Sequence, residues 1–155
     1  MKHLRLFVVL LLAYLPAASI AGVLHAGAAK IDITDQTGKV NDRLYARALA
    51  LRNGNITAVL VSIDAVAIGG IGRIKNDFLP RVRAKLKNEL GIAPENTLFN
   101  ASHCHGLVHS EIEARTIEVV RRAVRSMVPV KVGVGVGRET RIMENRRLIL
   151  KDGST

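Results

Sequence analysis

Aromatic residues are scarce in this 155-residue chain, which has two tyrosines, three phenylalanines and no tryptophan. Its formal net charge is nevertheless +10. Proteins that bind single-stranded nucleic acid usually stack the bases on aromatic side chains beside a basic groove. Such stacking platforms are scarce here, and Lys and Arg alternate with Glu in the helical segments. We therefore expect no nucleic-acid site, but a solvated basic surface that is attracted to anionic lipid or to an acidic substrate.

Cysteine is also scarce, because Cys104 is the only one. One cysteine cannot form a disulfide within the chain, so stability must come from packing. The N-terminus nevertheless predicts export to an oxidising compartment. Lys2 and Arg5 precede an apolar run at residues 6–18, and small residues at Ser19 and Ala21 are placed for cleavage after Ala21. The run is shorter than the roughly 20 residues of a spanning helix, so we expect a signal peptide at residues 1–21 and a secreted or periplasmic protein.

The first half of the mature chain has the pattern of β-strands. Residues 28–34 alternate loosely, and two β-rich runs at residues 45–51 and 56–63 are joined by Asn53-Gly54-Asn55, a strong hairpin signal. The second run is almost continuously apolar from residue 58 to residue 63. This composition is typical of a strand that is covered on both faces.

The second half alternates helices with strands. A helix is expected to start near Asp77 and to stop at Gly91. Ser110 and Glu113 form the capping-box pattern of a second helix, which Pro129 ends. Strands are expected at residues 97–101 and 130–137. The order predicts an α/β fold of the mixed α+β kind, in which two main helices pack on a mixed sheet. We expect residues 22–155 to be one domain and an incomplete part of a larger one.

The strongest chemical signal is the pair His103 and His105, which directly follows the strand expected at residues 97–101. Side chains at i and i+2 of a strand lie on the same face, so both imidazoles can point into one site while Cys104 points away. Imidazole is a common metal ligand and a common proton-transfer group. The motif alone is equally compatible with a hydrogen-bonded surface loop, because a catalytic zinc normally needs three protein ligands.

Several segments resemble the N-terminal part of the neutral/alkaline, non-lysosomal ceramidase family. They occur in the same order over nearly the whole mature chain, and the histidine motif is among them. The others are Ala-Gly-Ala-Ala-Lys-Ile-Asp-Ile-Thr (26–34), Leu-Tyr-Ala-Arg-Ala-Leu (44–49), Val-Ser-Ile-Asp (61–64), Gly-Ile-Ala-Pro-Glu-Asn (91–96) and Asn-Arg-Arg (145–147).

The resemblance implies roles for four residues. His103 corresponds to a ligand of the catalytic Zn²⁺, and His105 to a histidine that contacts the reacting group. Arg146 corresponds to an active-site arginine, and Asn145 to its neighbour in a substrate-binding motif. The implied reaction is hydrolysis of an N-acyl amide bond of a lipid-like substrate, with ceramide giving sphingosine and fatty acid. Association with a membrane surface would suit such a substrate.

The chain also departs from the family pattern. His-Cys-His replaces His-Thr-His, and Gly-Leu-Val-His follows where the family has Ser-Gly-Pro. The family's remaining metal ligands, a histidine, a glutamate and a tyrosine, would lie after residue 155, so we expect a further C-terminal part of the same protein to be needed. Three other interpretations stay open: a non-catalytic module that binds lipid or a partner chain, a barrel-type amidohydrolase, and a basic nucleic-acid-binding protein.

Overall fold

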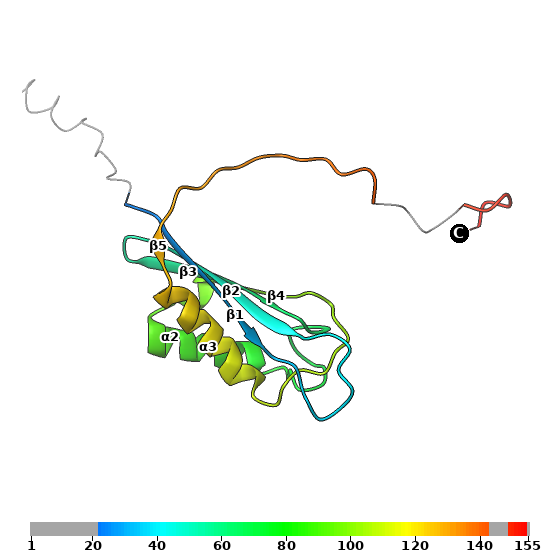
Figure 1. Ribbon diagram of the computed structural model, residues 1–155, viewed down its shortest axis with the longest axis horizontal. Helices are drawn as coiled ribbons and strands as arrows, with labels where there is room; N and C mark the ends of the chain where they lie inside the picture. Colours follow the sequence, from blue (N-terminus) through cyan, green and yellow to red (C-terminus); the bar gives the residue numbers. More distant parts are fainter. Residues whose placement is uncertain (1–21, 143–148, 155) are drawn as a thin grey trace, which may run out of the picture.

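The protein is built on a five-stranded mixed sheet with two helices on one face (Figure 1). The computed structural model describes residues 22–142 and 149–154. The strand order is β4-β3-β2-β1-β5. The neighbours β1, β2 and β3 are antiparallel, β4 runs parallel to β3, and β5 pairs antiparallel with β1. The predicted α+β fold is confirmed. The strands are β1 (His25–Asp32), β2 (Tyr45–Asn53), β3 (Ile56–Ile63), β4 (Thr97–Ala101) and β5 (Val128–Pro129).

Both helices lie where the sequence predicts them, on the same side of the sheet (Figure 1). Helix α2 (Phe78–Leu90) follows Asp77 and ends at Gly91, whose φ of 67° is left-handed. A 3-10 turn, η1 (Pro94–Asn96), then leads into β4. Helix α3 (Ile112–Arg125) buries one stripe against β1 and β2. The core between the helices and the sheet includes Ala46, Ala48, Ala50, Val59, Val61, Ile63, Phe78, Val82, Leu86, Val119, Val120 and Ala123.

The capping box expected at the start of α3 is not formed. The helix begins at Ile112 after Glu111, and no side chain caps its first turn. Glu113 instead accepts a hydrogen bond from Arg81 at 2.8 Å and lies 3.0 Å from Lys85, both on α2. These inter-helix ion pairs occupy the carboxylate that a capping box would turn back to its own helix.

The strand expectation at residues 130–137 is wrong as well. Among the described residues, only Val128 and Pro129 pair with β1. The Val130 N–H still donates to the Leu24 carbonyl at 2.8 Å, and the chain then continues as an extended segment outside the sheet (Figure 1). Val134 and Val136 are fully exposed, at 96% and 102%. A strand is defined by its ladder of hydrogen bonds. β5 is the last strand at this edge of the sheet, and within the described residues no strand pairs with the segment that follows it.

Within residues 22–142 and 149–154, one face of the sheet is bare, contrary to the expectation that residues 58–63 are covered on both sides. Leu60 is 40% exposed, and its cross-strand neighbours Leu49 and Leu98 are 40% and 59% exposed. A shallow hollow of about 610 Å³ lies on this face, and its lining includes Leu49, Leu60, Lys30 and Arg47. Large apolar side chains in a row on a sheet usually mark a surface that contacts something else.

Gly27 allows α3 to lie directly on β1. A Cβ atom built at this position would be 2.1 Å from the carbonyl oxygen of Ala123, which is helix backbone and cannot yield by a rotamer change. We therefore expect Gly27→Ala to lower the free energy of unfolding by about 1–3 kcal/mol, the usual range for overpacking. Urea unfolding measures this, with Gly38→Ala as control because its added methyl would meet open space. Equal midpoints for the two variants would contradict this packing.

Candidate functional site

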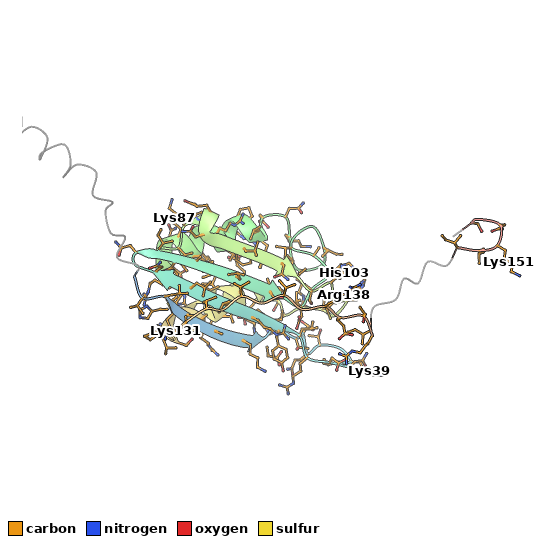
Figure 2. All side chains as sticks on the ribbon, turned by 90° about the horizontal axis from the view of Figure 1, so that it is seen from above. Lys39, Lys87, His103, Lys131, Arg138 and Lys151 are labelled. Carbon is orange, nitrogen blue, oxygen red and sulfur yellow. The ribbon has the colours of Figure 1, made fainter. Side chains whose placement is uncertain are left out.

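Two loops meet where the parallel strands β3 and β4 end. Residues 64–66 follow β3 and residues 102–105 follow β4, and hydrogen bonds join them beyond the last strand residues. The Ser102 N–H donates to the Ile63 carbonyl at 3.0 Å, and the Cys104 N–H donates to the Ala65 carbonyl at 3.0 Å. Ligand sites in open α/β sheets commonly lie at the carboxyl ends of parallel strands. Figure 2 shows His103 at this end of the sheet.

His103 is held in an uncommon conformation with a defined ring orientation. Its φ of 61° lies in the left-handed region, which residues other than glycine seldom adopt outside functional or tightly constrained sites. Its Nδ1 lies 3.1 Å from the Val66 carbonyl oxygen. A carbonyl oxygen only accepts hydrogen bonds, so Nδ1 must carry the proton and donate. In the neutral ring the lone pair is then on Nε2, and the side chain is exposed.

His105 lies next to His103, but not for the reason that the sequence pattern suggests. The ring centroids are 5.0 Å apart and the ring planes meet at 81°, an edge-to-face contact. Strand β4 ends at Ala101, so the pair belongs to a loop and not to one face of a strand. Cys104, between them, is partly buried against the core. The bend at His103, and not strand alternation, brings the two rings together.

Asp64, the residue directly after β3, is a member of this site that the sequence motifs did not indicate. Burial alone would raise the pKa of its carboxyl group, but hydrogen bonds from the Tyr45 N–H, the Arg47 guanidinium and the Ser102 hydroxyl outweigh burial and hold the pKa below its usual value. The carboxylate is thus an ionised acceptor. Its position directly after β3, which pairs with the strand that leads into the histidine loop, is the signal that could have identified it.

A second hollow, of about 460 Å³, has His105 in its lining. Its lining comes from the loop between β1 and β2, including Asp35 and Lys39, and from residues 104–107. Figure 2 shows Lys39 at the same end of the sheet as His103. His105 therefore faces a space large enough for part of a small molecule, whereas His103 is not part of this lining.

The wall of this hollow depends on an ionised Asp35. Hydrogen bonds from the Thr37 hydroxyl and N–H, together with an ion pair with Arg73, lower the pKa of Asp35 to about 2. Because this pKa is depressed in the folded state, its stabilising contribution is present above the unfolded value of about 4 and is lost as the pH falls towards 2. We expect the urea midpoint of the wild type to fall more steeply over this window than that of Asp35→Asn. Parallel pH curves would contradict the assignment.

The described residues fit part of a metal site. A metal-binding histidine usually donates its second ring N–H to a carbonyl or a carboxylate, as His103 does to Val66. Within residues 22–142 and 149–154, no group of three His, Cys, Asp or Glu side chains could hold a metal ion. Asn145 and Arg146 lie outside the described residues, so the structure does not place them relative to His103.

Comparison with solved structures identifies a fold neighbour. The chain shares its fold with part of a neutral ceramidase. The neutral ceramidase from Pseudomonas aeruginosa matches with a TM-score of 0.56 and 20% sequence identity over 69% of this chain, and a ceramidase complexed with C2 gives the same values. The match spans 22% of each of those chains. No family model matches the sequence, and no curated protein does either.

The ceramidase resemblance noted in the sequence is therefore confirmed at the level of the fold. The predicted signal peptide, residues 1–21, lies outside the described residues. None of the described helices has the length and apolar composition needed to cross a bilayer.

Proposed function

We propose that this chain is the N-terminal part of a secreted or periplasmic, zinc-dependent amidase that hydrolyses the N-acyl amide bond of a lipid-like substrate, with ceramide as the default. The observation that carries the proposal is the orientation of His103. Its Nδ1 donates to the Val66 carbonyl, which leaves the lone pair of Nε2 available at the carboxyl end of a parallel strand pair. The fold shared with a neutral ceramidase supports the choice of reaction class.

Each of the four candidate residues would have a separate role in the reaction. His103 Nε2 would hold Zn²⁺, which when bound acts as a Lewis acid and lowers the pKa of a coordinated water. His105, 5.0 Å away from ring to ring, would donate a hydrogen bond to the amide carbonyl oxygen. Arg146 would stabilise the negative charge that develops on that oxygen, and Asn145 would orient the substrate.

Further polypeptide would complete the site. A catalytic zinc usually has three protein ligands, and His103 supplies one. Two observations support an additional part: the match covers 22% of the similar ceramidase, and one face of the sheet carries an exposed row of leucines. We propose that the C-terminal part of the same protein packs on this face and provides the remaining ligands.

The surface suits a lipid-like substrate. Lys30 and Arg47 flank Tyr45, with the Lys30 Nζ 5.0 Å and the Arg47 Cζ 5.2 Å from the ring centroid. The chain carries 23 basic and 13 acidic residues. This excess of positive charge would favour association with an anionic membrane surface, where lipid amides are presented.

Removal of the metal tests the proposal. We expect the full product of the gene, purified after export, to release fatty acid from an N-acyl sphingosine, to lose this activity on dialysis against a chelator, and to regain it with one equivalent of Zn²⁺. Activity that survives complete removal of the metal would contradict the zinc mechanism.

The non-catalytic alternative makes a different prediction. A truncated module would bind lipid vesicles or a partner chain through the bare leucine face, and the exposure of Leu98 is the observation in its favour. Such a module would release no fatty acid with or without Zn²⁺, while Leu98→Asp would abolish its binding to vesicles.

A further inference from the structure

We propose that Asp64 is the positioning residue that fixes the His103 ring with Nε2 presented outward. The inference rests on the proposed function in one respect, namely that Nε2 binds Zn²⁺. The statement about ring orientation, however, is testable without any metal.

The Asp64 carboxylate is anchored on three sides. It accepts a hydrogen bond from the Tyr45 N–H at 2.9 Å, and both of its oxygens lie 2.9 Å from Arg47 Nη1. The third partner is the Ser102 hydroxyl, at 3.0 Å. The side chain is 14% exposed, compared with 49% for that of Arg47. A partly buried carboxylate with this many donors has one preferred orientation.

These contacts reach His103 through its neighbour in the chain. Ser102 is tied to Asp64 by its hydroxyl and to the Ile63 carbonyl by its N–H. On the other side of His103, the Cys104 N–H is bonded to the Ala65 carbonyl. The segment that begins at Asp64 therefore holds the residues on both sides of His103.

The same segment supplies the partner of the His103 ring, because the Val66 carbonyl accepts the bond from Nδ1. A left-handed φ at a histidine persists only where the surroundings enforce it. Among the described residues, the carboxylate of Asp64 is the charged group that joins this segment to Ser102. Loss of that link would leave the backbone bonds of Ser102 and Cys104 in place but would loosen the Ser102 side of His103, and with it the alignment of the His103 ring with Val66.

An asparagine at position 64 has nearly the same size and shape as aspartate, but it lacks the negative charge and the second acceptor oxygen. Its amide has one acceptor oxygen, and its NH₂ group would face the donors of Arg47, Tyr45 or Ser102. We therefore expect Asp64→Asn to break the anchor without enlarging or shrinking the site. Asp32→Asn is the matched control, because Asp32 is likewise at the carboxyl end of a strand, as its last residue, and accepts bonds from the Thr34 N–H at 2.8 Å and Arg43 at 3.3 Å.

The test is the tautomer of His103, read from the ¹⁵N chemical shifts of histidine-labelled protein without metal. In the wild type and in Asp32→Asn we expect the proton on Nδ1. In Asp64→Asn we expect a mixture of both tautomers, Ser102→Ala should reproduce that mixture, and Ser102→Thr should restore the wild-type spectrum. If Asp64→Asn does not fold, Ser102→Ala carries the test, since it removes a single hydrogen bond. An unchanged tautomer in the folded variants would overturn the proposal.

Zinc binding separates this inference from the proposed function. If both hold, Asp64→Asn should weaken Zn²⁺ binding by about 10- to 100-fold, the usual effect of losing a group that orients a ligand. A tautomer that shifts while neither Asp64→Asn nor His103→Ala alters Zn²⁺ affinity would support the positioning role and overturn the metal role of His103.

Discussion

Replacement of His103 by alanine should lower the rate of N-acyl amide hydrolysis by more than about 100-fold. Loss of a group that merely orients a metal ligand already costs 10- to 100-fold, and His103 is proposed as the ligand itself. The fold should survive, because the side chain is exposed and its one hydrogen bond is to the Val66 carbonyl. Initial rates with an N-acyl sphingosine, at equal zinc and protein concentrations, measure the effect.

His109→Ala is the control for that experiment. His109 is a histidine of the same loop, four residues after His105. Its Nδ1 accepts a hydrogen bond from the Glu111 N–H at 3.1 Å, and its Nε2 lies 3.3 Å from Arg115. Both ring nitrogens are thus directed at the start of α3, and we expect activity within a few-fold of the wild type. Equal losses in the two variants would show that the loop as a whole, and not His103, matters.

Phe78→Ala should lower the free energy of unfolding by about 3–5 kcal/mol, the range for truncation of a large buried aromatic side chain. Phe78 is the first residue of α2, is 1% exposed and is the largest fully buried side chain among the described residues. Few other aromatic residues exist in this chain to fill the space. Urea unfolding followed by circular dichroism measures the loss.

Ile56→Ala is the comparison for the core variant. Ile56 is also a large apolar residue at the start of an element, but it lies next to the hairpin turn and is 65% exposed. Surface substitutions of this kind usually change stability by less than about 0.5 kcal/mol. A similar loss for both variants would contradict the placement of Phe78 in the core.

Most of the fold could be predicted because local signals coincide with it. The turn at Gly54 fixes the β2–β3 hairpin, and Gly91 ends α2 in the left-handed conformation that glycine favours. The failures concern tertiary partners. Glu113 pairs with α2 instead of capping α3, and the alternation at residues 130–137 is that of a strand which has no neighbour among the described residues. A period of two shows that a segment can form a strand, but not what it pairs with.

The site was predicted less completely than the fold. The sequence identifies His103 and His105 as neighbours, yet their proximity arises from a left-handed residue in a loop, which strand periodicity cannot anticipate. Asp64 lies 38 positions before Ser102 in the sequence, and only the parallel pairing of β3 and β4 brings the two together. Arg146 and Asn145 remain predictions.

The most direct test of the account is anomalous X-ray diffraction at the zinc edge from crystals of the zinc-loaded protein. We predict a single strong anomalous peak about 2.0–2.1 Å from His103 Nε2, the usual zinc–imidazole distance, while Nδ1 still faces the Val66 carbonyl. A zinc ion bound elsewhere, with the His103 ring free of metal, would contradict the central claim.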